Sequence, residues 1–366
     1  MRAALLNTGT ELLLGDVHDA HLAFIAREIL PFGLRFEERR TVGDTEAIRH
    51  ALAELFPSCE ILFVTGGLGP TGDDITREMV ADLLALELRQ SPDLFLLPGP
   101  PRELQPMFRA FVAPILRSIV PASALVERRL YKIADKGESL VEEAIGNHVL
   151  AIPGIELGYC ARPGEVDVRI VGKSKAIEQA DAVIRSTLGS SIFSAADETL
   201  EQVIVKLLTQ RNQTLAVAES CTGGLVANRI TNVPGASEVF LAGYVCYANQ
   251  AKINMLNVDA QLIEKHGAVS EQVARALAEH ARVCARSDYA LATTGVAGPG
   301  GGSPDKPVGT VYIALAASDE TIVKKLFFPT DRETFKQIAT QAALELLRRK
   351  LLDSAPIHSE RSRGIP

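Results

Sequence analysis

The apolar positions of the first 120 residues alternate between two periodicities. Short apolar runs at 3–6, 61–64 and 94–97 have the length and composition of buried strands. Apolar residues spaced three or four apart mark amphipathic helices at 19–30, 44–56, 74–87 and 101–119. Strands that alternate with helices of this length predict parallel β-α-β units, so we expect a three-layer α/β domain over residues 1–120.

Residues 121–195 follow a different plan with shorter elements. The pattern gives a strand at 125–133, a helix at 138–149, a hairpin formed by 156–160 and 166–171, a helix at 174–188 and a short strand at 192–193. This β-α-β-β-α-β order predicts a small α+β connector between two larger domains.

The α/β rhythm returns over residues 196–352. Apolar strands are expected at 215–218, 239–247, 289–293, 309–316 and 322–328, with helices between them and a last helix at 331–350. The tail 353–366 is polar, contains two prolines and has no periodicity, so we expect it to be disordered. The predicted fold class is therefore α/β, with two three-layer α/β domains joined by a small α+β connector.

Composition narrows the class of protein. The formal net charge is −7 and the basic residues are scattered, which argues against a nucleic-acid partner. No apolar run reaches the ~18–20 residues of a membrane span, and the first residues lack the apolar core and cleavage site of a signal peptide. The five cysteines are widely spaced, without zinc-site or thioredoxin spacing. We therefore expect a cytoplasmic protein with reduced thiols and no membrane partner.

The first candidate for chemistry is the segment that follows the strand at 215–218. Ser220 stands at a strand-to-helix turn, followed by Cys221, Thr222, Gly223 and Gly224. Such a turn can expose a nucleophile beside backbone N–H groups that form an oxyanion hole. An ordinary N-cap with glycines for close packing is an equally open interpretation. Cys221 is the rival nucleophile, but no histidine lies nearby in sequence to activate it.

A lysine and a tyrosine follow the next strand. Tyr247 ends that strand and Lys252 falls in the first turns of the following helix, where the helix dipole disfavours a cation. A partly buried lysine at this place could lose its proton and act as a general base for serine. A solvated helix lysine is the alternative.

The third candidate is a glycine-rich loop, residues 293–303, followed by Lys306-Pro307-Val308-Gly309-Thr310. Glycines let successive N–H groups approach a phosphate and form an anion nest. The loop lacks the lysine ending of a Walker motif, and a plain mobile loop fits the pattern as well.

These three segments together resemble the C-terminal domain of the CinA family, the nicotinamide-nucleotide amidases. The resemblance covers about 200–350 and rests on AESCTGG at 218–224, the Tyr247–Lys252 segment, HGAVSEQV at 266–273, TTGVAGPGGG at 293–302 and KPVGT at 306–310. It implies hydrolysis of the carboxamide of nicotinamide mononucleotide to nicotinate mononucleotide and ammonia. The implied roles are nucleophile for Ser220, base for Lys252 and assistance from Tyr247, with no cofactor.

The same resemblance implies which residues bind the substrate and how the protein associates. The expected binding residues are Cys221, Thr222, Gly223, Gly224, Thr294, Gly295, Gly298, Gly300, Gly301 and Arg332. Arg332 matches the arginine of the family's GDR-type segment, although a threonine replaces the preceding glycine. A small-molecule substrate and a homo-oligomer are the partners implied.

The N-terminal segments resemble the molybdopterin-binding-like domain of the same family. Thr65–Thr76 is a glycine-rich strand-to-helix turn that contains Asp73 and Asp74. In some members this domain is an ADP-ribose pyrophosphatase. In this chain, the two aspartates would hold the divalent cation that such an activity uses. The aspartates could instead only cap the helix. This pyrophosphatase, or a non-enzymatic competence-associated protein, is the alternative function.

The N-terminal domain departs from the family pattern in length. Family members generally have some tens of residues between the helix that starts near Thr76 and the LPGPP segment at 97–101, whereas here residues 88–92 join them directly. The missing part would line the pocket, so we expect a shortened domain with little or no activity. Residues 121–195 resemble the family's KH-like connector, but without a basic GxxG loop they predict no RNA binding.

Overall fold

The computed structural model describes residues 1–69, 74–85 and 93–353 of the chain. It divides into two compact units, one made of 1–128 with 171–178 and the other of 129–170 with the chain from 179 onward. The units do not coincide with the three predicted domains, whose boundaries stay predictions. The predicted tail lies outside the described residues, except for Asp353 at the end of the last helix.

The first unit contains a parallel sheet of four strands in the order β2-β1-β3-β4. Its strands are β1 (Ala3–Thr8), β2 (Phe36–Val42), β3 (Ile61–Thr65) and β4 (Asp93–Leu97). All residues of β1 and β3 are buried, as expected for central strands of a parallel sheet with both faces covered.

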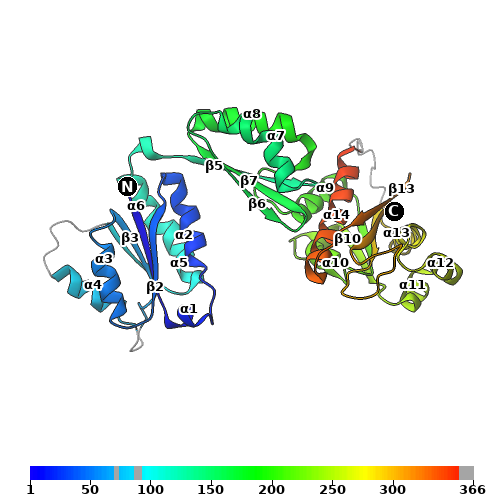
Figure 1. The fold of residues 1–366 in the computed structure, drawn as a ribbon, viewed down its shortest axis with the longest axis horizontal. Helices are drawn as coiled ribbons and strands as arrows, with labels where there is room; N and C mark the ends of the chain where they lie inside the picture. The colour runs from blue at the N-terminus through cyan, green and yellow to red at the C-terminus, as the bar shows by residue number, and fades with distance from the viewer. Residues whose placement is uncertain (70–73, 86–92, 354–366) are drawn as a thin grey trace, which may run out of the picture. The chain divides into compact units, whose positions relative to one another are not determined.

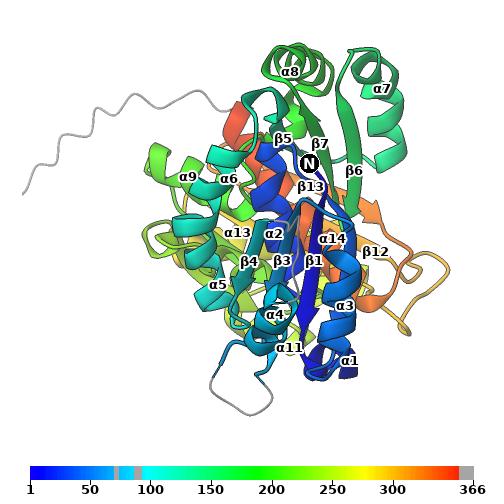
Figure 2. The same cartoon turned by 90° about the vertical axis from the view of Figure 1, so that its left-hand side faces the viewer.

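Helices cover both faces of this sheet (Figure 1). Because side chains alternate along a strand, Leu5 packs on one face and Leu6 on the other. The first face carries α2 (His21–Ile29), α5 (Pro101–Met107) and α6 (Ala113–Ile119), with a π-helical turn, Phe108–Val112, between the last two. The other face carries α3 (Ala47–Leu55) and α4 (Thr76–Ala85), and Figure 2 views the unit from that side. The predicted three-layer α/β arrangement is confirmed.

Two elements of this unit were missing from the sequence prediction. The short helix α1 (Thr10–Leu14) follows β1 directly, and β2 forms the edge of the sheet. In β2 the half-buried positions include Glu38 and Arg40, which form an ion pair with each other. Charged residues on the inward side of an edge strand hide the period of two, so a search for apolar runs cannot find it.

The connector has the predicted order of elements. They are β5 (Glu127–Ala134), α7 (Glu138–Leu150), β6 (Glu156–Arg162), β7 (Glu165–Gly172), α8 (Ser174–Leu188) and β8 (Ile192–Ser194). Its four strands form a separate sheet in the order β6-β7-β5-β8.

The C-terminal part of the second unit contains a five-stranded mixed sheet in the order β10-β9-β11-β12-β13. Its strands are β9 (Leu215–Glu219), β10 (Phe240–Val245), β11 (Tyr289–Gly295), β12 (Thr310–Ala316) and β13 (Thr321–Phe327). The first three in space, β10, β9 and β11, are parallel, and β12 and β13 continue the sheet antiparallel. The carboxyl ends of three parallel strands therefore meet at one edge.

Two helical layers enclose this sheet. One face packs on α9 (Leu200–Arg211), α10 (Leu225–Thr231) and α14 (Arg332–Asp353) through larger side chains such as Val217 and Leu291. The other face packs on α11 (Asn249–Leu256), α12 (Ala260–His266) and α13 (Glu271–Ala285). That face is built from alanines of β9, β11 and β12, which let α13 approach the sheet closely.

The helix α14 joins the sheet to the connector within the second unit. Near its middle, the Gln341 amide donates to the Glu165 carboxylate at 2.9 Å, and Gly164 at the tip of the β6–β7 hairpin lies against the same glutamine. Further along, the buried Arg348 donates to the Glu345 carboxylate and to the Ser190 carbonyl. Among the described residues, no helix is long and apolar enough to cross a membrane.

Candidate active site

The segment that follows β9 forms the turn predicted from its glycines. Gly223 and Gly224 take φ values of +61° and +94°, a region that side chains other than glycine rarely occupy. The Ser220 N–H donates to the Thr293 carbonyl of β11 at 3.0 Å, and the residue is 9% exposed. Ser220 is thus held at the carboxyl ends of two neighbouring parallel strands, the usual position of ligand sites in such sheets.

The N-cap interpretation of Ser220 is wrong. The residue before α10 is Gly224, and the buried carboxylate of Glu219 takes the place of a cap. It accepts from the N–H groups of Gly224, Val226 and Ala227 at 2.8–3.0 Å. The Gly224 N–H is therefore already bonded to Glu219. Of the N–H groups of residues 221–224, those of residues 221–223 remain candidates for the predicted oxyanion hole.

Cys221 points into the core beneath the turn. It is 5% exposed and belongs to the cluster that contains Val226 and Phe335. Burial raises the pKa of its thiol to about 12, so the thiolate is scarce near neutral pH. This environment disfavours Cys221 as the nucleophile relative to Ser220.

Lys252 lies in the first turn of α11 and is 1% exposed, which excludes the solvated-lysine alternative. Its Nζ donates to the carbonyls of Cys246 and Tyr247 at 3.0 and 3.1 Å. Burial lowers the pKa of the Lys252 amine below its ordinary value. Because the Cys246 N–H donates to the Glu219 carbonyl at 2.8 Å, this lysine lies at the same sheet edge as Ser220.

Arg332 links three of the predicted site segments. Its Nη2 donates to the Tyr247 hydroxyl at 2.8 Å and its Nη1 to the Gly298 carbonyl at 2.9 Å. The first residue of α14, the tyrosine after β10 and the glycine-rich loop after β11 are therefore in contact. Tyr247 is 59% exposed, so this group forms an accessible rim.

The glycine-rich loop is folded against the segment that follows it. A Cβ on Gly298 would lie 2.6 Å from Val308, so only glycine allows this packing. Thr294 is fully buried and its hydroxyl donates to the Ala268 carbonyl at 2.8 Å, so its side chain is turned away from solvent. Gly300 and Gly301 are exposed, and Gly295 lies partly exposed at the end of β11.

Two residues near the turn were not singled out from the sequence. One is Glu219, whose carboxylate organises the turn. The other is Lys336, whose Nζ lies 3.8 Å from the position that a Cβ would take on Gly223. The spacing of four residues from Arg332 places Lys336 on the same side of α14, and this spacing was the available signal.

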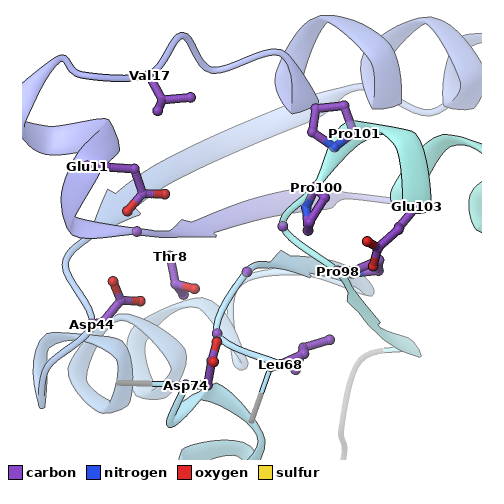
Figure 3. A pocket seen from close by; sticks show the side chains of 15 residues that line it. Thr8, Glu11, Val17, Asp44, Leu68, Asp74, Pro98, Pro100, Pro101 and Glu103 are labelled. Atoms are coloured by element: carbon purple, nitrogen blue, oxygen red, sulfur yellow. The ribbon is translucent and has the colours of Figure 1, made fainter. Parts of the chain in front are cut away.

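The N-terminal unit has a pocket of about 540 Å³ at the carboxyl ends of its strands (Figure 3). Gly66, Gly67 and Gly69 line it, and four carboxylates, those of Glu11, Asp44, Asp74 and Glu103, surround it. In Figure 3, Glu103 lies across the cavity from the other three.

The possible metal site at Asp73 and Asp74 stays a prediction. Asp73 lies outside the described residues, and Asp74 lines the pocket. Within the part of the chain that the structure describes, no group of three or more His, Cys, Asp or Glu residues could hold a metal ion.

Comparison with known proteins decides the family. A family model described as "CinA C-terminal domain" matches residues 197–351, and one described as "Probable molybdopterin binding domain" matches residues 4–96. A CinA-like protein of Akkermansia muciniphila is 36% identical over 398 residues, which covers 94% of this chain and 96% of the relative. The chain belongs to the CinA family.

A second relative agrees with this assignment. A protein of Caldicellulosiruptor bescii named as competence-damage inducible is 36% identical over 412 residues, covering 96% of this chain and all of the relative. A crystal structure of a competence/damage inducible protein from Agrobacterium tumefaciens is 38% identical, with a TM-score of 0.40, and covers 41% of this chain and 92% of that one. Both sequence alignments are longer than this chain of 366 residues, so the relatives contain segments that it lacks.

The environments of the thiols predict which cysteines react. Cys160 and Cys284 are exposed, whereas Cys59, Cys221 and Cys246 are buried with raised pKa values. We expect iodoacetamide to alkylate only the two exposed cysteines of the native protein, and all five after unfolding, as read by peptide mass mapping. Rapid alkylation of native Cys221 would mean that the turn presents the thiol rather than the serine.

Proposed function

We propose that the C-terminal domain hydrolyses the carboxamide of nicotinamide mononucleotide, releasing ammonia and nicotinate mononucleotide. The observation that carries the proposal is the burial of Lys252 at the carboxyl ends of the parallel strands, where Ser220 also lies. A lysine whose pKa is lowered by burial can be neutral and accept a proton, which is the activation that a serine nucleophile requires. The family resemblance supplies the substrate.

The proposed reaction has two halves. The neutral Lys252 amine takes the Ser220 proton while Oγ forms a bond to the carboxamide carbon and the carbonyl electrons move to oxygen. The N–H groups of residues 221–223 stabilise this oxyanion. The tetrahedral intermediate collapses, the C–N bond breaks, and the Lys252 ammonium protonates the leaving nitrogen, which departs as ammonia. Water, deprotonated by the same amine, then hydrolyses the ester and frees Ser220.

Arg332 and Tyr247 are proposed to bind the nucleotide part. Arg332 uses two of its N–H groups on Tyr247 and Gly298, which fixes the guanidinium and leaves further donors for a phosphate. Lys336 adds positive charge near Gly223. The reaction requires no metal or other cofactor in this domain, and we place the enzyme in the cytoplasm as a homo-oligomer.

Two alternatives have weaker support. A metal-dependent ADP-ribose pyrophosphatase would need an N-terminal metal site, and Asp73, one of its two proposed ligands, lies outside the described residues. A non-enzymatic competence protein agrees with the names of the relatives. It gives no reason for the burial of Lys252.

Replacing Ser220 separates the two candidate nucleophiles. Ser220→Ala should lower kcat for nicotinamide mononucleotide on the order of 10³-fold, because nucleophile and base act as a unit. Cys221→Ala should keep most of the activity, since the thiol is buried and protonated. Ammonia release measured for both purified variants decides, and an active serine variant beside an inactive cysteine variant would reverse the assignment.

The base assignment predicts that Lys252→Arg is as damaging as Lys252→Met. Arginine keeps its proton in proteins and cannot act as a base. The matched control is Lys206→Arg, a substitution at an exposed lysine, and this variant should be fully active. A cooperative thermal unfolding transition in each variant is the check that it is folded. Substantial turnover by Lys252→Arg would mean that this residue supplies only positive charge.

The pH dependence of the wild type follows from the same assignment. Only the neutral amine is active, so kcat/KM should rise with pH and level off above the pKa of Lys252. Because burial lowers this pKa, the midpoint of the rise should lie below 10.5. A rate that falls as pH rises through this range contradicts a lysine base.

The shortened N-terminal domain should contribute little chemistry. We expect the full chain to hydrolyse ADP-ribose poorly or not at all with magnesium, manganese or cobalt, while its amidase activity persists in EDTA. Release of AMP from ADP-ribose and release of ammonia from nicotinamide mononucleotide, measured on the same preparation, separate the two domains. Metal-dependent turnover of ADP-ribose that is lost in Asp74→Ala would establish a bifunctional enzyme instead.

A further inference from the structure

Glu219 is buried directly before Ser220, yet the proposed reaction assigns it no step. We propose that Glu219 is a positioning residue, whose carboxylate fixes the turn that presents Ser220 Oγ and the N–H groups of residues 221–223. This inference rests on the proposed function. It concerns a residue that acts through the nucleophile turn and does not touch the substrate.

The contacts of Glu219 reach Thr222 in the turn and the residues that begin α10. Its Oε2 accepts from the Thr222 hydroxyl at 2.6 Å and from the N–H groups of Gly224 and Val226 at 3.0 Å. Its Oε1 accepts from the Ala227 N–H at 2.8 Å. The residue is 1% exposed, so water cannot replace these acceptors. One carboxylate thus satisfies three of the N–H groups that the start of a helix leaves without partners.

Hydrogen bonds connect this carboxylate back to the proposed nucleophile. The Thr222 hydroxyl, bonded to Glu219, also lies 2.7 Å from the Thr293 hydroxyl. The Thr293 carbonyl accepts from the Ser220 N–H at 3.0 Å. Glu219, Thr222, Thr293 and Ser220 therefore form a closed group, with Glu219 itself fixed in β9 between β10 and β11.

The turn needs such a group because its own residues do not rigidify it. Two successive glycines with positive φ give the chain many alternative conformations, and the N-cap Gly224 has no side chain to bond. A carboxylate is acceptor-only and suits a cluster of donors. A displacement of a reacting group by about 1 Å can cost roughly 10²-fold in rate. Losing this carboxylate should therefore reduce kcat. KM should stay nearly unchanged, because the residues proposed to bind the nucleotide are not altered.

The test is Glu219→Gln in the full chain. Glutamine has the same reach, but its amide group must present an N–H₂ to at least one backbone N–H donor, so the turn loses an acceptor and gains a repulsive contact. We expect kcat for nicotinamide mononucleotide to fall roughly 10- to 100-fold with KM nearly unchanged. The pH at the midpoint of the kcat/KM rise should stay the same, because Lys252 is untouched.

The matched control is Asp259→Asn in the same domain. Asp259 also caps a short helix, accepting from the Gln261 N–H at 2.9 Å, but it belongs to α12. If Glu219 had only a structural role, both variants would lower the temperature of unfolding and leave kcat of the folded protein unchanged. Wild-type kcat in folded Glu219→Gln overturns the proposal.

A second variant covers the case in which Glu219→Gln does not fold. Thr222→Val keeps the size and the backbone N–H but removes the hydroxyl that joins Glu219 to Thr293. Thr222 was expected to bind substrate, but it is completely buried and its hydroxyl bonds Glu219, so its loss should leave KM unchanged. Thr222→Val should lower kcat by a smaller factor, and a wild-type kcat in this variant would also contradict the proposal.

A fluorophosphonate probe separates this inference from the proposed function. It labels an activated serine whatever the natural substrate is. Failure of the wild type to release ammonia refutes the amidase, yet slower labelling of Ser220 in Glu219→Gln would still support the positioning role. Labelling at the wild-type rate would refute that role.

Discussion

The Lys252 amine is held by the carbonyls of Cys246 and Tyr247 in a place where its side chain is almost completely removed from water. Burial disfavours the charged form of a lysine and lowers its pKa, and the proposed role of Lys252 as a proton acceptor depends on this one constraint. The neighbouring parts of the fold place the lysine at this position. The pairing of β10 with β9 brings the segment that carries Lys252 to the end of β9, and α11, which contains the lysine, packs on the alanine-lined face of the sheet.

The organisation of this site follows from parallel strands. Because β10, β9 and β11 run in the same direction, the segments that follow them meet, although they are far apart in sequence. Arg332, in the first turn of α14, joins two of these segments by donating to the Tyr247 hydroxyl and to the Gly298 carbonyl. The same helix contacts the connector through Gln341 and Arg348, so one rigid element joins the proposed substrate rim to the rest of the second unit.

The sequence predicted what apolar periodicity encodes. The parallel strands, their helices and the convergence of the three motifs could be expected, because buried strands are apolar on both faces and their ends coincide. It missed β2, whose inward positions Glu38 and Arg40 are charged, and it left the environment of Ser220 open. Whether a serine caps a helix or faces a site depends on tertiary contacts. Here Glu219 does the capping and Cys221 fills the core, and no local pattern distinguishes these arrangements.

We propose that this chain cleaves the carboxamide bond of a pyridine nucleotide with groups of its C-terminal domain alone. The most direct measurement incubates the purified full chain with nicotinamide mononucleotide in EDTA and quantifies ammonia and nicotinate mononucleotide together. We expect both products to accumulate in equal amounts. The proposal is contradicted if neither product appears, or if they appear only when a divalent metal ion is supplied.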